Sequence, residues 1–232
     1  MIAAVTANRR IDTRFLRLLR DDRSGMAIVE FALALPFFVG FTMGGVELTN
    51  YTTTKMRMSQ IALQVADNAS RIGTGNVMAA KQISEAQVND ILTGAGLQAD
   101  ALDLYGRGRV IVYSLEPMAN PNPTNLFRIR WKRCRGAKTT YPGNYTQGQT
   151  NIPGFLYTPP VGLPQTITAP VGGAVMVVQL SYTYRPLITQ AFVLKSEITE
   201  FGAMTVRDPR DMAGPTGGVG LYNTENVTIS SC

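Results

Sequence analysis

The N-terminal third of the chain carries two successive patterns of apolar positions. Residues 26–46 are predominantly apolar and contain one charged residue, Glu30, and a run of about 20 such residues is long enough to cross a bilayer as a helix. Over residues 47–72 the apolar positions are spaced by alternating steps of three and four, which is the spacing of one face of an α-helix. This stripe consists of Tyr51, Thr54, Met58, Ile61, Val65, Ala69 and Ile72.

The two patterns follow one another without a helix-breaking residue. No Gly or Pro occurs in residues 46–72, and the Gly-Thr-Gly sequence at residues 73–75 supplies a stop. We therefore predict one helix over residues 26–72, about 70 Å long at 1.5 Å per residue. Its first half would lie in the membrane, and its second half would form the spine of a globular head. The alternative is two helices that meet at a bend near Gly44 and Gly45.

Small residues recur every four positions within the apolar segment. Ala32, Pro36, Gly40 and Gly44 fall on one helical face, and a Gly-x-x-x-Gly sequence lets a second helix approach closely in lipid. Pro36, Gly40 and Gly44 are therefore candidate helix-packing residues, although Gly is also common by chance in membrane helices. Pro36 removes one backbone hydrogen bond, so the helix should bend or unwind locally around it.

After the long helix, the sequence predicts a shorter helix followed by strands. Ser84 and Gln87 have the spacing of a capping box, and Gly94 should end this helix. Residues 110–115 and 126–132 have the composition of strands and flank a turn rich in Pro and Asn, which predicts a hairpin.

The strongest strand pattern lies at residues 174–184, which are nearly continuously apolar at first and then alternate. Residues 192–207 show β-branched alternation and should pair with this strand as the last one. Residues 208–232 look irregular. The predicted fold class is therefore α+β, with a long N-terminal membrane-spanning helix that continues as a spine packed against a C-terminal antiparallel β-sheet domain.

Apolar and cationic residues alternate along residues 126–132, which predicts a strand with one apolar and one cationic face. The cationic face is either solvated, which is the simpler interpretation, or a site for an anionic partner. The alternating residues are Phe127, Arg128, Ile129, Arg130, Trp131 and Lys132.

Residues 135–172 are rich in Gly, Pro, Thr, Asn and Tyr and contain no long apolar run. This composition predicts a long loop. Such a loop is either an exposed contact surface or variable padding between strands, and its length favours contact, because long loops in compact domains are usually functional.

Composition narrows the chemistry that the chain can carry. The sequence has no His, which excludes Ser-His-Asp and Cys-His nucleophiles and His-based zinc sites. The acidic residues lack metal-loop spacing, and neither a phosphate-binding Gly motif nor a nucleophile elbow occurs. We therefore predict no enzyme activity, no metal and no cofactor. A catalytic carboxylate pair would have to come from Asp100, Asp103, Glu116, Glu197 and Glu200.

The net charge of +6 is unevenly placed. Residues 1–25 hold six Arg and three Asp, a balance of +3, and positive charge beside a membrane helix keeps that end in the cytoplasm. The remaining charge is too dilute to predict binding to nucleic acid.

Cys134 and Cys232 both follow the apolar segment. With the N-terminus in the cytoplasm they face an oxidising compartment, where a disulfide is the default. The bridge would close a loop of roughly 100 residues and contribute up to about 4–5 kcal/mol in the chain-entropy model. The alternatives are two separate thiols, or a bond from Cys232 to a partner chain.

Glu30 is the one charged residue of the apolar segment. An ionised carboxylate costs roughly 2.5–3.5 kcal/mol at the centre of a spanning helix, and less near the cytoplasmic end, where Glu30 would lie. Taken alone, Glu30 is equally well explained as a tolerated residue at the membrane interface, whose side chain snorkels toward water or pairs with Arg23.

The residues around Glu30 resemble the processing site of tight-adherence (Tad/Flp) pilins. In that family the cut follows a Gly, the fifth mature residue is Glu and the sixth is aromatic, and here Gly25, Met26, Glu30 and Phe31 match these positions. Residues 29–36, Val-Glu-Phe-Ala-Leu-Ala-Leu-Pro, resemble the opening of TadE-like pseudopilins.

The resemblance implies a TadE-like pseudopilin that takes part in assembly or initiation of an adhesive Tad/Flp pilus. A prepilin peptidase would cut between Gly25 and Met26, Glu30 would neutralise the terminal amine of a neighbouring subunit, and Phe31 would contribute to recognition by the peptidase. The implied partners are this peptidase, other pilin or pseudopilin subunits, the inner-membrane pilus assembly platform and the lipid bilayer. The alternative is an uncleaved single-pass membrane protein whose periplasmic domain binds a ligand or partner.

These expectations place the protein in the bacterial inner membrane as a single-pass protein, with incorporation into the pilus as a further step. Its N-terminus would be cytoplasmic and its C-terminal domain periplasmic. Residues 180–186 also loosely resemble the closing region of TadE-like proteins. The predicted parts are a cytoplasmic basic leader (1–25), a transmembrane helix (26–46), an amphipathic spine helix (47–72) and a periplasmic α+β domain (73–232).

Overall fold

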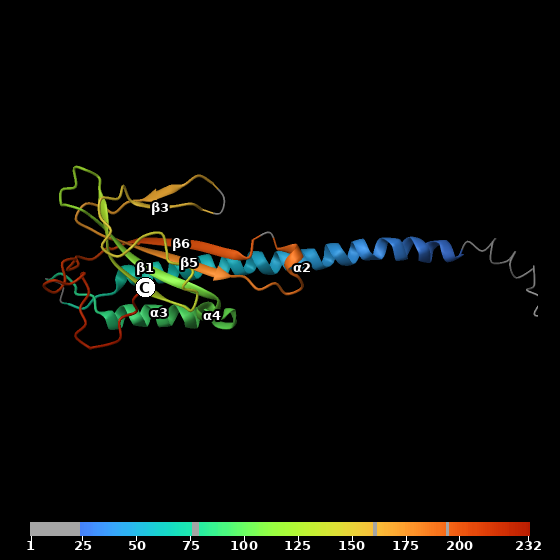
Figure 1. Cartoon of the computed structure of the whole chain (residues 1–232), viewed down its shortest axis with the longest axis horizontal. Helices are drawn as coiled ribbons and strands as arrows, with labels where there is room; N and C mark the ends of the chain where they lie inside the picture. The colour runs from blue at the N-terminus through green and yellow to red at the C-terminus, as the bar shows by residue number, and fades with distance from the viewer. Residues whose placement is uncertain (1–23, 76–78, 160–161, 194) are drawn as a thin grey trace, which may run out of the picture.

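The long N-terminal helix is continuous in the computed structural model. Helix α2 (Ser24–Arg71) has 48 residues and remains helical through Pro36. Figure 1 shows its N-terminal half, in blue, extending from the head as a stalk. The prediction of one helix is confirmed, and the alternative of two helices is wrong. Residues 1–23 of the predicted leader lie outside the described residues. The structure describes residues 24–75, 79–159, 162–193 and 195–232.

The two halves of α2 have different surroundings. The N-terminal half is long and apolar enough to cross a membrane, and its most apolar stretch is not buried by the rest of the described chain. In the C-terminal half, the predicted stripe faces the sheet: Met58 and Val65 are fully buried, while Tyr51 and Ile72 pack at its ends. The amphipathic spine is therefore confirmed, and its apolar face forms part of the core of the head.

The head is built on a four-stranded antiparallel sheet with the order β2-β1-β5-β6. β1 (Gly108–Pro117) and β2 (Phe127–Arg135) form the predicted hairpin, and β5 (Val175–Thr183) pairs with β1 and with β6 (Glu197–Thr205). The last strand begins later than predicted, because a 3₁₀ helix, η2 (Gln190–Phe192), precedes it. The α+β fold class is confirmed.

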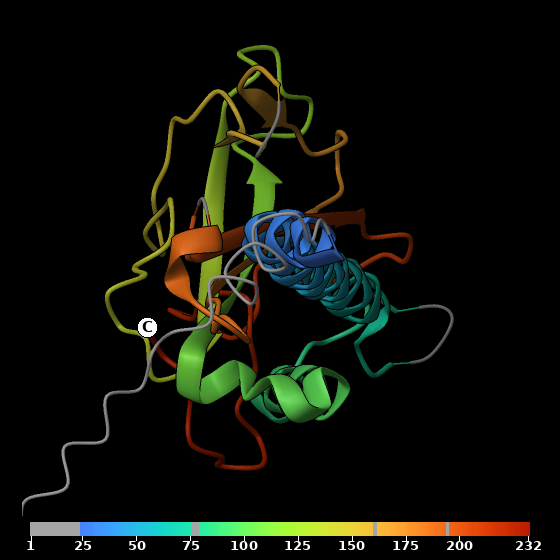
Figure 2. The same cartoon turned by 90° about the vertical axis from the view of Figure 1, so that its right-hand side faces the viewer.

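Helices α2 and α3 (Glu85–Ala99) pack against the same face of this sheet and share one apolar core with it. Figure 2 looks toward the N-terminal end of α2 and shows α3 beside it. Strand β6 passes very close to α2: a Cβ atom added to Gly202 would lie 2.4 Å from the carbonyl oxygen of Ala62. The absence of a side chain at Gly202 therefore sets the distance between helix and sheet.

Helix α3 starts as predicted and ends later than predicted. The side chains of Ser84 and Gln87 form a complete capping box. The expected end at Gly94 is wrong, because a helix can continue through Gly at a cost of about 1 kcal/mol and the tyrosine hydroxyl of Tyr105 donates to the carbonyl of Leu92 in its last turns. The helices η1 (Asp100–Leu102) and α4 (Leu104–Arg107) connect α3 to β1.

A β-bulge between β1 and β2 changes the face of the sheet on which the side chains of β2 lie. The register between β1 and β2 shifts after Tyr113. Phe127 and Ile129 therefore belong to the apolar core on the outer face of the sheet, which is the face opposite α2 and α3. Trp131 belongs to the core between the sheet and these helices. The prediction that these three residues share one face is wrong at Trp131, because one extra residue in a strand reverses the direction of the side chains that follow.

The cationic residues of β2 are covered rather than solvated. Lys132 and Arg133 are buried, and Arg128 is half-buried. Arg133 donates from Nε to Glu85 at 2.8 Å and from Nη2 to the other oxygen of the same carboxylate. Arg128 lies 3.2 Å from Glu116, whose pKa is raised by burial. On the predicted cationic face, Arg128 binds this carboxylate, while Arg130 and Lys132 donate to the backbone carbonyls of Ala213 and Pro142. The prediction of a solvated face is therefore wrong, because the cations bind groups within the head.

Residues 136–172 form a cover over the outer face of the sheet, apart from the two residues outside the described chain. The cover contains a small hairpin of β3 (Phe155–Tyr157) and β4 (Gln165–Ile167). Phe155 is fully buried, with its ring centroid 5.1 Å from that of Tyr113 on β1. The expectation of a loop without its own structure is wrong, because its scattered aromatic residues close a second apolar core.

Residues 208–232 contain no helix or strand longer than an isolated bridge, as predicted. They nevertheless follow the head closely. Arg210 forms a bridge with Lys81 and Tyr222 with Ser84, and the hydroxyl of Ser230 donates to Asn89 of α3 at 2.6 Å. This tail therefore packs along the start of α3.

Candidate assembly site on the N-terminal helix

The residues predicted for processing and assembly lie together at the start of α2. Gly25 and Met26 belong to its first turn, Glu30 and Phe31 follow in the next, and all four are exposed. Met26 and Glu30 are four residues apart, which places them on the same side of the helix, one turn from each other. A chain that began at Met26 would therefore carry an ammonium group and a carboxylate at one end of one helix.

The chemistry of this helix end favours a negative charge. The first N–H groups of a helix have no partner within the helix, and the helix dipole is positive there. The side chain of Glu30 makes no hydrogen bond or ion pair with another described residue. The alternative partner, Arg23, lies outside the described residues, so its pairing with Glu30 stays a hypothesis.

The face of small residues on α2 is only partly occupied by the chain itself. A Cβ atom added to Gly40 would meet no other atom within 4 Å, whereas one added to Gly44 would lie 3.6 Å from the ring of Phe192. Gly44 therefore faces the protein's own head. The side of the helix near Pro36 and Gly40 is open to a second helix, and their role in helix packing remains a prediction.

A buried carboxylate fixes the stalk to the head. Glu47 lies one residue beyond the predicted span and is fully buried. It accepts hydrogen bonds from the hydroxyl of Tyr184 at 2.6 Å, from the backbone N–H of Leu187 at 3.0 Å and from that of Ile188 at 2.8 Å. The hydrogen bond from Tyr184 is the main reason that the pKa of Glu47 is lowered, and it outweighs the opposing effect of burial.

The same helical turn holds Tyr184 from two further sides. Asn50 donates from Nδ2 to the hydroxyl of Tyr184 at 2.6 Å, and the ring of Tyr51 meets that of Tyr184 edge to face, with centroids 5.1 Å apart. Burial, together with the hydrogen bond to Glu47, raises the pKa of Tyr184 to about 12. The hydroxyl therefore stays protonated and donates to the carboxylate at neutral pH.

The sequence alone predicted no role for Glu47, which is the first residue after the apolar segment 26–46. One signal was present: Glu47 precedes Tyr51 by four residues and so extends the buried stripe of the spine. Its partner Tyr184 is the first residue after β5. The contact joins residues more than a hundred positions apart, and no local pattern predicts such a pair.

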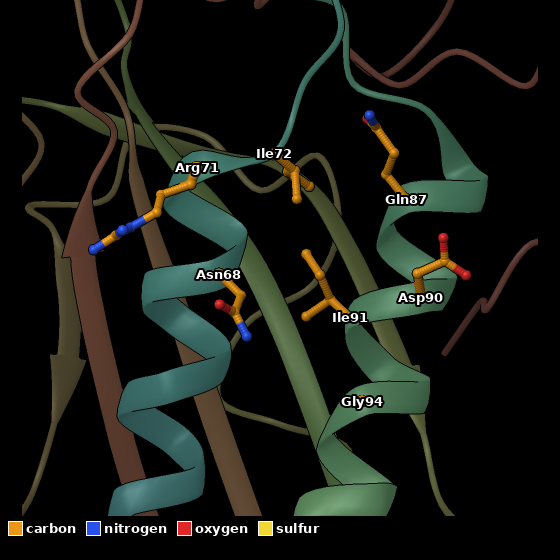
Figure 3. Close-up of a pocket in the computed structure, with 7 residues that line it drawn as sticks. All are labelled: Asn68, Arg71, Ile72, Gln87, Asp90, Ile91 and Gly94. Carbon is orange, nitrogen blue, oxygen red and sulfur yellow. The ribbon is translucent and has the colours of Figure 1, made fainter.

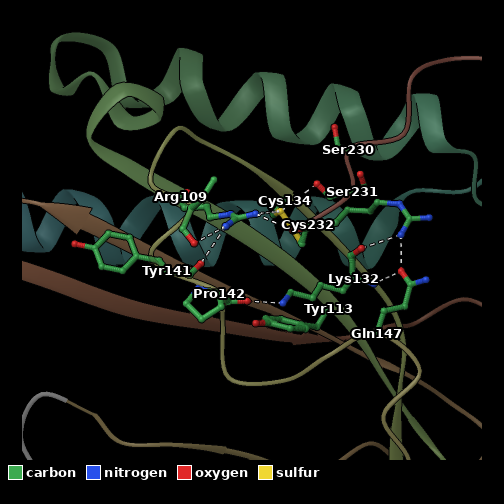
Figure 4. The surroundings of a disulfide bond; sticks show 12 residues. Arg109, Tyr113, Lys132, Cys134, Tyr141, Pro142, Gln147, Ser230, Ser231 and Cys232 are labelled. Carbon is green, nitrogen blue, oxygen red and sulfur yellow. Dashed lines mark hydrogen bonds between the residues drawn. A yellow bond between two sulfur atoms is a disulfide. The ribbon is translucent and has the colours of Figure 1, made fainter.

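Cys134 and Cys232 form the predicted disulfide, with their Cα atoms 5.4 Å apart. Figure 4 shows the bond at the end of β2, beside Arg109 and Lys132. The backbone N–H of Cys134 also donates to the carbonyl of Ser230 at 2.9 Å. The alternatives of two separate thiols or a bond to another chain are therefore wrong for this structure.

The carboxylates considered for catalysis are not brought together. Asp100 begins η1 and Asp103 follows its end, Glu116 on β1 binds Arg128, and Glu197 and Glu200 lie on β6. Within the described chain, no three Cys, Asp or Glu residues form a cluster that could hold a metal ion.

The groove drawn in Figure 3 lies between the end of α2 and α3. It has a volume of about 440 Å³ and is lined by one cation, Arg71, one carboxylate, Asp90, and mostly amide and apolar groups. This lining gives the groove no pair of groups for acid–base chemistry.

Comparison with known proteins gives one result. The family described as TadE-like protein matches residues 25–71, which are the residues of α2 apart from its first. The predicted resemblance is confirmed over this helix, and the match points to a Tad pilus-associated protein. Curated proteins and solved structures give no match to the chain.

Proposed function

We propose that this protein is a pseudopilin subunit of the Tad/Flp pilus, cut by a prepilin peptidase after Gly25 and assembled through α2. The observation that carries the proposal is the coincidence of the family match with the helix. The matched segment starts at residue 25 and ends with α2, and its N-terminal half leaves the head as an exposed apolar stalk.

Glu30 gives this stalk a chemical means of assembly. A carboxylate in lipid is costly when unpaired, and a neighbouring subunit that begins at Met26 would supply an ammonium group to pair with it. The open side of α2 near Pro36 and Gly40 would receive the neighbour's helix. The inner membrane would hold the subunit, with its head in the periplasm, until the assembly platform adds it to the pilus.

Mass spectrometry of the N-terminus tests the cleavage. The full chain is produced with and without the prepilin peptidase, and we expect a chain that begins at Met26 only when the enzyme is present. Gly25→Val should block the cut, because a branched side chain replaces the small residue at the scissile bond. Gly45→Val, in the same helix where an added Cβ meets nothing within 4 Å, is the matched control and should be cut normally. An intact Met1 with active peptidase would instead support an uncleaved single-pass protein that binds a periplasmic partner.

Glu30→Ala tests the assembly step. We expect the variant to insert into the membrane and to be cut as well as wild type, while pilus number falls roughly tenfold or more because an ammonium group loses its buried partner. Counting pili by electron microscopy, with membrane fractionation in parallel, measures both. Glu30→Asp keeps the charge and should retain more pili than Glu30→Ala. Wild-type pilus numbers in Glu30→Ala would show that Glu30 is only an interfacial residue.

A further inference from the structure

The connection between β5 and β6 is the part of the head that reaches furthest along the stalk. Figure 1 shows it in orange beside α2, beyond the ends of α3 and α4. Residues 185–193 of this connection are called the foot here. Two backbone N–H groups of the foot, those of Leu187 and Ile188, donate to Glu47, so the foot is fixed to one turn of the helix.

The foot presents apolar side chains to the outside. Leu187, Ile188 and Phe192 are 65%, 42% and 42% exposed, although they are large hydrophobic residues within six positions of one another. The ring of Phe192 lies against Gly44, so this apolar surface is continuous with the exposed apolar side chains of α2. Continuity of this kind indicates one environment for both surfaces.

The position of the foot along α2 matches the edge of a bilayer. Residues 26–46 span about 30 Å at 1.5 Å per residue, the thickness of a hydrocarbon core. Gly44 and Glu47 therefore mark the point where the helix would leave the lipid. Arg185 at the start of the foot and Lys195 just after it are both exposed, and cations at this depth suit anionic headgroups.

We propose that the foot is a second membrane contact, in which Leu187, Ile188 and Phe192 enter the headgroup boundary of the outer leaflet while Arg185 and Lys195 meet anionic lipid. This inference rests on the proposed membrane span of α2. The foot holds the head at one depth and one orientation on the bilayer, because Glu47 joins it to the helix.

Fluorescence quenching by brominated lipids tests the inference on the full chain. The protein is reconstituted into vesicles of phosphatidylcholine and phosphatidylglycerol, with bromine near the upper part of the acyl chains. Phe192→Trp reports on the foot, and the native Trp131, which is buried, gives a constant background. Phe38→Trp reports on the span. Leu97→Trp, at a position 78% exposed on α3, is the matched control on the head.

We expect Phe38→Trp and Phe192→Trp to lose about half or more of their added emission to brominated lipid, as interfacial and inserted side chains do, and Leu97→Trp to lose none. Quenching of Phe38→Trp without quenching of Phe192→Trp would overturn the membrane contact of the foot and leave the membrane span of α2 standing. If the emission wavelength of Phe192→Trp changes with the protein density in the vesicles and brominated lipid does not quench it, the foot contacts a second copy of the chain, and the inference is also overturned. Absence of quenching at Phe38→Trp would overturn the membrane span itself, and the foot with it.

Discussion

At the scale of single residues, the junction of stalk and head depends on Tyr184. Its hydroxyl donates to Glu47 and accepts from Asn50, both at 2.6 Å. Tyr184→Phe removes both bonds and keeps the ring, so we expect it to lower the free energy of unfolding by about 1.5–3 kcal/mol, typical of a hydrogen bond to a charged group. Thermal unfolding in detergent measures the change. Tyr157→Phe removes an exposed hydroxyl of the cover and should cost less than about 1 kcal/mol; an equal loss in both variants would contradict the role of the junction.

The same contact should make stability depend on pH. Hydrogen bonds hold the pKa of Glu47 below its ordinary value of 4.5 in the folded chain. A carboxyl group of this kind stabilises the fold fully above its unfolded pKa and loses that contribution as the pH falls through the folded pKa. The unfolding midpoint of wild type should therefore fall as the pH drops below about 4.5. Tyr184→Phe should show a weaker fall over the same range, because the main cause of the lowered pKa is gone.

At the scale of elements, the contact between α2 and β6 depends on one missing side chain. A Cβ atom at position 202 would lie 2.4 Å from a backbone oxygen of α2, so Gly202→Ala must push the strand and the helix apart. We expect a loss of about 1–3 kcal/mol or more from overpacking, measured by chemical unfolding. Gly94→Ala is the matched control, because an added Cβ there meets nothing within 4 Å and Ala favours the helix by roughly 0.5–1 kcal/mol. A stable Gly202→Ala would show that helix and sheet are not in close contact.

The elements that follow one regular period were predictable from the sequence. The stripe of the spine, the capping box at Ser84 and the strand after residue 174 are each set by neighbours a few positions apart, and they form as predicted. The bulge before Trp131, the hairpin of the cover and the burial of Arg133 depend on contacts between distant segments. Of the candidate site, residues 25–31 could be found from their own spacing, whereas Glu47 acquires its role only when Tyr184 folds onto it.

At the scale of the whole molecule, the disulfide holds the C-terminal tail on the head. Cys134 and Cys232 are 98 positions apart, and a loop of this length corresponds to up to about 4–5 kcal/mol in the chain-entropy model. Replacing both by Ser should lower the unfolding midpoint. It should also raise the hydrogen exchange of residues 222–232 while leaving the exchange of the N-terminal half of α2 unchanged. Cys134→Ser alone should equal the double variant, since either change removes the one bond. Unaltered exchange in the tail would show that its other contacts suffice.

Helix α2 forms the stalk with its N-terminal half and part of the core of the head with its C-terminal half, so the head can fold only when all the elements of that core have been made. Helix α2 precedes every strand of the described chain, whereas β6, which covers its buried stripe, is the last strand of the described residues. The core of the head therefore cannot close until β6 has been made. Until then, the apolar stripe of the spine lacks the strand that covers it.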